Sequence, residues 1–304
     1  MRQSILATAL IKAIRETTRL FSSHRKLWLP FLVTACVEAC LLGMIWLAPH
    51  PPFSKLFAPP IRYFFGDRML HYPWHLWFLY YAMKHTQVMA SITVGAFMTG
   101  VACALVRQWH QGGILSIRDV LVHREVRYVR VCILWAVIWG MARVAGVVVA
   151  RFIPDPIGRF WVGLGLILLL QSALIYAIPV VIFHRCSWLK AMGYSVKETL
   201  RHPVSTILVV VLPSTLLVLF AIVVSPGRAT QWMVQISPEF MLVCMLGRLI
   251  LWTVVDAVVT VSVCHLWWFH RGPSLEPVAC SHAKSLSSAV AASSGDLKEN
   301  AVVA

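Results

Sequence analysis

The sequence predicts an all-α integral membrane protein, a bundle of about six transmembrane helices with interfacial amphipathic helices. Three observations predict this class. The chain is 59% hydrophobic and only 13% charged, whereas about a quarter of the residues in a soluble domain are charged. Six apolar windows are long enough to cross the roughly 30 Å of hydrocarbon in a bilayer. Lys and Arg gather in alternate segments between these windows, as in proteins that cross the membrane several times.

Each predicted span contains about 20 predominantly apolar residues. In chain order the six windows are residues 27–48, 86–106, 131–150, 160–183, 204–224 and 241–263. The last window can run on to Phe269. The start of the second is the least defined, because Leu76 to Tyr81 is already apolar and aromatic and can extend the helix outward or lie along the surface.

The distribution of basic residues predicts that both ends of the chain lie in the cytoplasm. Eighteen of the 27 Lys and Arg residues fall in segments 1–26, 107–130, 184–203 and 271–304, against seven in the segments of the other side. The cytoplasmic side carries such an excess, so we expect contacts with anionic lipid headgroups there. Nucleic acid is not an expected partner, because long apolar runs divide the basic residues.

Three regions are expected: a cytoplasmic amphipathic helix at 1–26, a transmembrane domain at 27–270 and a disordered cytoplasmic tail at 271–304. In the first region an apolar face and a basic face alternate at helical spacing. The apolar face holds Leu6, Leu10, Ile14, Thr17 and Phe21, and the basic face holds Lys12, Arg15 and Arg19. Specific binding of anionic lipid and a simple anchoring role remain alternatives for this helix.

A similar tripeptide precedes the first, third and fifth spans. The three copies are Ile14-Arg15-Glu16, Ile117-Arg118-Asp119 and Val196-Lys197-Glu198. Each lies in an amphipathic stretch that leads into a membrane helix, which suggests three copies of one unit. The alternative is coincidence in a basic, helical chain.

Four ionisable residues lie inside the predicted spans: Glu38, Arg143, Arg248 and Asp256. A charge at the middle of a bilayer costs about 2.5 to 3.5 kcal/mol, so these residues are the candidates for an internal polar path or for structural ion contacts. Glu38 and Arg143 lie at matching depths, about 17 and 18 Å from the inner ends of their spans. Arg248 and Asp256 are about 12 Å apart along one helix, too far to bond each other.

The outer segment 49–85 is rich in proline and aromatic residues and is expected to fold back onto the membrane surface. Tyr72, Trp74 and Trp77 are its candidates for docking a lipid, a glycan or a partner protein. A metal site at His71 and His75 is disfavoured by Pro73 between them. The eight cysteines include no C-x-x-C pair, and no catalytic motif is present. We therefore expect no metal, no cofactor and no enzymatic activity.

Pro179, with Gln171, predicts a kink in the fourth span, where neighbours satisfy the freed carbonyl. The stretch from Tyr176 to His184, followed by Lys190-Ala-Met-Gly-Tyr-Ser195-Val-Lys-Glu-Thr-Leu, resembles the membrane domain of some bacterial glycerophosphodiester phosphodiesterases and related free-standing six-helix proteins. There, an acidic residue stands at the place of His184. The catalytic domain of those enzymes is missing from this chain, so the resemblance implies a membrane scaffold or accessory module.

The expected function is therefore an accessory or scaffold component of a membrane-bound machine, acting with membrane protein partners in a bacterial inner membrane. The alternative is a transporter, or a component that flips lipids or solutes, which uses Glu38, Arg143 and Asp256 along an internal path. The basic, Ser/Thr-bearing N-terminus is also typical of a mitochondrial presequence.

Overall fold

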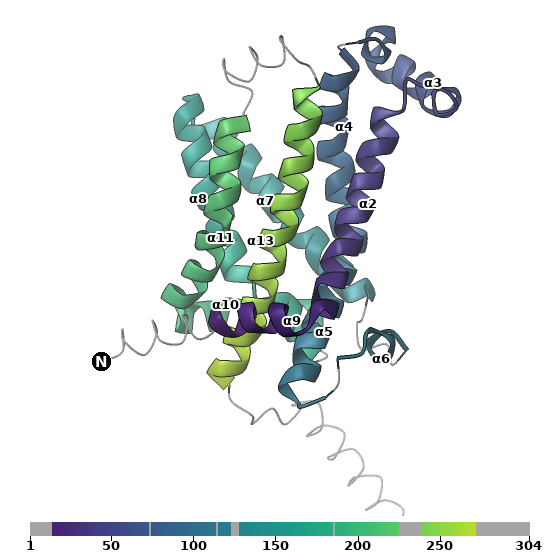
Figure 1. The fold of residues 1–304 in the computed structure, drawn as a ribbon. Coiled ribbons are helices and arrows are strands. Elements are labelled where there is room, and N and C mark those ends of the chain that lie inside the picture. The colour runs from purple at the N-terminus through teal and green to yellow at the C-terminus, as the bar shows by residue number, and fades with distance from the viewer. Residues whose placement is uncertain are drawn as a thin grey trace, which may run out of the picture.

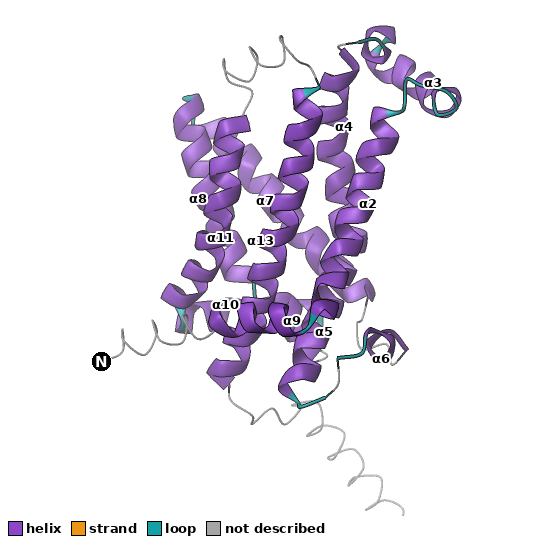
Figure 2. Ribbon diagram, viewed as in Figure 1, coloured by secondary structure: helices purple, strands orange, loops and turns teal. Residues whose placement is uncertain are grey.

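The computed structural model describes residues 14–72, 74–113, 115–122, 128–184, 186–224 and 239–271. Within these ranges every regular element is a helix, which confirms the predicted all-α class (Figure 2). The expectations for Leu6, Leu10 and Lys12, and for the tail after Arg271, concern residues outside the described ranges.

Among the described residues six helices are long and apolar enough to cross a membrane, as the hydropathy pattern predicted. They are Arg25–Trp46, Trp74–His110, Tyr128–Phe152, Pro156–His184, Pro203–Phe220 and Phe240–His270. The second span begins well before the predicted window, so the aromatic stretch from Leu76 to Tyr81 extends this helix outward.

Several spans consist of more than one element (Figure 1). The spans are built from η1 (Arg25–Trp28) with α2 (Leu29–Trp46), α4 (Trp74–Ala90) with the π-helical η3 (Ser91–Gly95) and α5 (Ala96–His110), α7 (Tyr128–Phe152), α8 (Pro156–Leu174) with α9 (Ala177–His184), α11 (Pro203–Val224), and α13 (Phe240–Arg271). The remaining helices are α3 (Ser54–Phe65), η2 (Asp67–Leu70), α6 (Ile117–Val122), α10 (Trp188–Arg201) and residues 14–23.

The two ends of the bundle carry different surface helices. We call the end that carries α3 the outer end, and the end that carries α10 and residues 14–23 the inner end (Figure 1). These names follow the side that the basic residues assign to the cytoplasm. The outer segment is more regular than its prolines suggested, because Pro59 and Pro60 lie inside α3.

The bundle is packed around α13, which contacts α11, α2 and α5. The main apolar core lies in the inner half, where α5, α9 and the second half of α13 meet. Small residues such as Ala102 and Ala104 are fully buried on α5 and let the neighbouring helices approach closely. A smaller apolar cluster occupies the outer half, formed by Leu42, Leu76, Leu79, Met83, Met241 and Met245. The inner half is therefore the more continuously packed part of the bundle.

The fourth span is broken between α8 and α9, which confirms the kink predicted at Pro179. Proline removes a backbone donor and clashes with the carbonyl of the preceding turn. Helix α10 supplies hydrogen-bond partners for backbone groups at this break. Ser195 Oγ accepts a hydrogen bond from the Tyr176 N–H at 3.1 Å and donates one to the Ala173 carbonyl at 2.8 Å. Thr199 Oγ1 donates to the Ser172 carbonyl at 2.9 Å.

The three copies of the tripeptide all lie in helices at the inner end, but their acidic residues differ in burial. Asp119 on α6 is exposed and Glu16 is half-buried, whereas Glu198 on α10 is only 2% exposed. The N-terminal helix packs against α13 through a bond between Thr17 Oγ1 and Ser262 Oγ, 3.1 Å apart. Ile14, predicted on the apolar face of that helix, is 41% exposed.

Candidate functional site in the outer half of the bundle

A cavity of about 380 Å³ lies in the outer half of the bundle, between α2, α4, α8, α11 and α13. Most of its walls are apolar or aromatic. The lining residues include Leu42, Met83, Phe160, Leu164, Leu217, Phe220, Met245, Leu249 and Trp252. The cavity is of the size of a small-molecule site, and its surroundings suit the apolar part of a ligand.

The cavity also has a polar edge formed by Lys84 and Gln87 on α4 and by Arg248 on α13. Both cations are exposed. Arg248 lies about 12 Å along α13 from its outer end. Among the described residues neither cation takes part in an ion pair. The cavity therefore presents two positive charges beside an apolar surface.

Glu38 stands behind this polar edge and is only 2% exposed. Its carboxylate accepts hydrogen bonds from Gln87 Nε2 at 3.1 Å and from Ser91 Oγ at 3.4 Å. Ser91 is the first residue of the π-helical turn η3, and such turns are frequent at functional sites. The buried carboxylate thus holds Gln87 in place on the cavity wall.

The structure brings three of the four predicted intramembrane charges together. Glu38 is within electrostatic range of both Arg248 and Asp256, and Asp256 is half-buried. Arg143 does not join them. It is exposed on α7, so its matching depth does not make it a partner of Glu38.

Of the predicted docking residues of the outer segment, Tyr72 and Trp74 are not among the residues that line the cavity. Tyr72 is 58% exposed and donates a hydrogen bond to Glu239 at 3.1 Å, and Trp74 is 52% exposed. The side chain of Trp77 lies outside the described part of the structure. Asp67 contacts His71 at 3.2 Å and Arg62 at 2.7 Å. The hydrogen bonds from His71 and Arg62 lower the pKa of Asp67.

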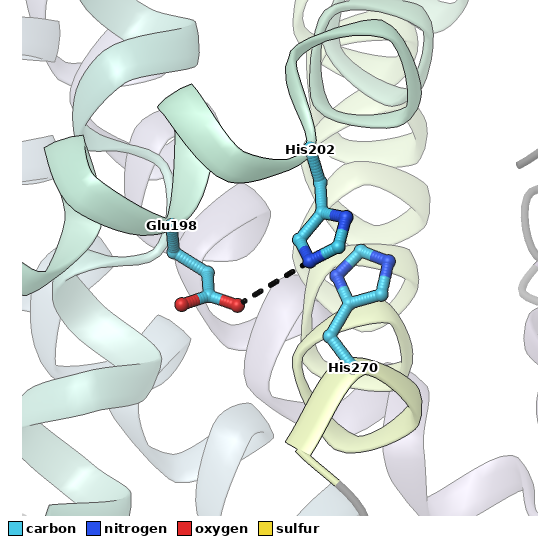
Figure 3. A group of neighbouring side chains, drawn as sticks. All are labelled: Glu198, His202 and His270. Carbon is cyan, nitrogen blue, oxygen red and sulfur yellow. Dashed lines mark ion pairs between the residues drawn. The ribbon is translucent and has the colours of Figure 1, made fainter. Parts of the chain in front are cut away.

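One group of three side chains within the described ranges could hold a metal ion, and it lies at the inner end, apart from the cavity. The group consists of Glu198, His202 and His270 (Figure 3). The sequence analysis did not find it. The Glu198-x-x-x-His202 spacing on one helix was a weak signal, but no sequence pattern connects α10 to His270 on α13.

Lys84, Gln87 and the aromatic walls of the cavity were also missed. Lys84 falls in the stretch before the predicted start of the second span, which was assigned to the outer segment, whereas Gln87 and most of the aromatic wall residues fall inside predicted spans that no sequence pattern connects. The hydropathy of Leu76 to Tyr81 was the signal that this stretch belongs to the bundle.

The cavity offers two cations, an amide and an apolar wall, with a buried carboxylate behind them. No family model, no curated protein and no solved structure matches this chain.

Proposed function

We propose that this integral membrane protein binds an anionic amphiphile in its outer cavity and acts as a lipid- or solute-handling component, without catalysing a chemical reaction. The ligand class is an acyl chain or similar apolar body with a carboxylate or phosphate group at one end. The observation that carries the proposal is the presence of Lys84 and Arg248 at the edge of an otherwise apolar cavity.

The charged residues and the apolar walls of the cavity match the two parts of such a ligand, its anionic group and its apolar body. A cation inside the membrane costs about 2.5 to 3.5 kcal/mol, and an anionic headgroup between Lys84 and Arg248 offsets this cost. Gln87 supplies a neutral hydrogen-bonding group beside them, and its own orientation is set by Glu38. The aromatic and aliphatic walls accept the apolar body.

The position of the cavity supports entry from the outer side. The cavity lies in the outer half, whereas the main apolar core closes the inner half. Asp256 lies about 12 Å farther along α13 than Arg248, where a mobile ligand or ion would next meet charge. This arrangement fits the outward-facing state of a transporter or flippase component.

The test is ligand retention by the full chain, purified in mild detergent and analysed by native mass spectrometry. The probes are oleate, dioleoylphosphatidylglycerol and the zwitterionic dioleoylphosphatidylcholine. A charge-assisted hydrogen bond contributes about 1.5 to 3 kcal/mol, and 1.4 kcal/mol is tenfold in affinity. We therefore expect R248Q and K84Q each to weaken binding of the anionic probe at least about tenfold.

Arg143→Gln is the matched control, because it removes one positive charge from the same bundle at a residue outside the cavity. R143Q should retain the ligand like the wild type. Equal retention by R248Q, K84Q and R143Q would refute the cavity as the binding site. Preference for oleate or for phosphatidylglycerol identifies a carboxylate or a phosphate as the headgroup. If the zwitterionic lipid binds as tightly as the anionic probes, the cavity does not recognise the charge of its ligand.

A second candidate function is the accessory or scaffold role in a bacterial inner membrane, which the resemblance to glycerophosphodiester phosphodiesterase membrane domains suggests. Arg143 supports it. This cation is exposed midway along α7, beside the exposed apolar residues Val144 and Val147. A transmembrane helix of a partner protein with a carboxylate at that depth would neutralise it.

The test of the accessory role is a pull-down of the tagged protein from its native membrane. A stoichiometric membrane protein that is retained by the wild type and by R248Q but lost from R143Q supports the accessory role. A protein that purifies alone with a bound amphiphile supports the first proposal instead.

A further inference from the structure

We infer that Glu198, His202 and His270 form a binding site for a first-row transition-metal ion, with zinc as the best match, at the inner end of the bundle. The site is independent of the outer cavity. Its ligands come from two helices that are distant in the sequence: Glu198 and His202 lie one turn apart at the end of α10, and His270 lies in the last turn of α13.

The three side chains already face one another (Figure 3). Their ligand atoms all lie within 4.8 Å of one another. Metal bonds of about 2.0 to 2.2 Å in a tetrahedral site place neighbouring ligand atoms roughly 3.4 Å apart. Convergence on an ion therefore needs the ligand atoms to move up to about 1.4 Å closer together and the two rings to turn out of their stack, because each nitrogen lone pair lies in the plane of its own ring.

The two imidazole rings pack against each other and have to tilt apart to share an ion. They stack with their centroids 3.7 Å apart and their planes at 19°. His202 Nε2 lies 3.9 Å from Glu198 Oε1. His270 Nδ1 is buried and has no hydrogen-bond partner among the described residues. A buried polar atom in this state costs free energy, and coordination of a metal ion would satisfy it.

The charged residues around the site favour the binding of a cation. Glu198 is buried, with 3% of its side chain exposed, and supplies one negative charge. Arg201 lies 3.8 Å from the other carboxylate oxygen, but 57% of its side chain is exposed, so it can turn toward water. His202 is 30% exposed, which leaves a path from the cytoplasmic solvent to the site.

The donor set selects the class of metal. Two imidazole nitrogens and one carboxylate oxygen suit zinc and its first-row neighbours, whereas calcium and magnesium prefer oxygen ligands. Three protein ligands leave a fourth tetrahedral position for water. Glu198 lies in the last turn of α10 and His202 directly follows its last residue, Arg201, so the two side chains stand at the same end of this helix.

The ion would connect three parts of the bundle. Helix α10 is the helix that satisfies the backbone groups freed at the break in the fourth span, through Ser195 and Thr199. A metal ion shared by Glu198, His202 and His270 would fasten this helix to α13. The site therefore acts as a clamp on the inner end, and metal availability would control how firmly that end is held.

The test uses the full chain, purified through a tag that contains no histidine, stripped with EDTA and titrated with Co²⁺ as a spectroscopic probe. We expect one equivalent to bind with the strong visible d–d absorption of a four-coordinate site, and Zn²⁺ to displace it. Changes to residues that only support a ligand lower metal affinity 10- to 100-fold. Removal of a ligand in H202Q or H270Q should therefore weaken binding at least about tenfold.

His71→Gln is the matched control, because His71 is exposed in the outer segment and contacts Asp67 outside the proposed site. H71Q should bind like the wild type. Absence of stoichiometric Co²⁺ binding, a six-coordinate spectrum, or equal binding by H202Q, H270Q and the wild type would overturn the inference.

A second measurement distinguishes loss of metal binding from poor folding of a variant. Zn²⁺ should raise the thermal unfolding midpoint of the wild type and of H71Q, because a ligand that binds the folded state stabilises it. It should leave the midpoint of E198Q unchanged. A wild-type midpoint that does not respond to Zn²⁺ would contradict the clamp.

Discussion

Replacing Ser195 by Ala tests the contact that holds the broken fourth span together. The Ser195 hydroxyl is fully buried and serves two backbone groups at once, the Tyr176 N–H and the Ala173 carbonyl. Alanine keeps the helix propensity of α10 and removes only the hydroxyl. The change therefore isolates the two hydrogen bonds.

The expected loss of stability can be worked out from these two bonds. Side-chain hydrogen bonds in a membrane protein contribute about 0.6 kcal/mol on average, which sets a lower value of about 1 kcal/mol for two. A buried donor or acceptor that is left without a partner costs about 1 to 3 kcal/mol. We therefore expect S195A to reduce the free energy of unfolding by about 1 to 3 kcal/mol.

The assay is reversible unfolding by SDS in mixed micelles, followed by tryptophan fluorescence, because the chain contains 13 Trp residues. Ser23→Ala is the matched control: Ser23 is exposed, and its hydroxyl donates to the Arg19 carbonyl within its own helix, at 2.8 Å. S23A should change the free energy of unfolding by less than about 0.5 kcal/mol. Equal effects of S195A and S23A would refute the argument that α10 supports the break.

Three further outcomes test other parts of the structure. Glu38→Gln removes the buried charge but keeps a hydrogen-bonding side chain. We therefore expect the variant to insert normally but to transfer a fluorescent anionic lipid more slowly in proteoliposomes. An unchanged rate of transfer would show that Glu38 has no part in the proposed function. Thr17→Val breaks the buried hydrogen bond to Ser262 on α13 and should weaken the packing of the N-terminal helix by about 1 kcal/mol. The measurement is the rate of proteolysis of this helix, which should increase. Cleavage at the wild-type rate would contradict the packing of this helix against α13. Hydrogen bonds from His71 and Arg62 lower the pKa of Asp67 below 3.8, so the stabilisation by this carboxylate is fully present above pH 3.8 and is lost as the pH falls through the lowered pKa. Hydrogen-exchange protection of η2 should decrease over that acidic range in the wild type, and D67N should show no such pH dependence; the same profile in both proteins would be the contrary result.

Hydropathy predicted the six spans because every backbone polar group in a membrane must be satisfied within its own segment or by a neighbour. Because this requirement applies to each segment separately, each span can be recognised from its own stretch of sequence. The prediction for the break at Pro179 succeeded for the same reason, since proline lacks the donor that its helix needs. The partner that satisfies the break was not predicted, because Ser195 and Thr199 reach it only through the packing of α10.

The pairing of charges could not be predicted from depth. Glu38 and Arg143 lie at similar depths on their spans, but α2 packs against α4 and α13, whereas α7 packs against α8 and α5. Depth follows from position in one helix. Contact between side chains depends also on which helices are neighbours and how each is rotated about its axis.

The three similar tripeptides show the same limit. Each was predicted in an amphipathic stretch, and each lies in a helix at the inner end. Of the three acidic residues only Glu198 is buried and lies near two histidines, because α10 packs against α7, α8, α9 and α11.

The sequence by itself determined the class of the protein, the number of its spans and the side on which basic residues gather, because the bilayer imposes length, apolarity and charge bias on each segment separately. Tertiary structure alone decided that Lys84 and Arg248 share a cavity, that Glu38 holds Gln87 on its wall, and that His270 meets α10. These are relations between helices far apart in the chain. They arise from helix packing, which no single segment encodes.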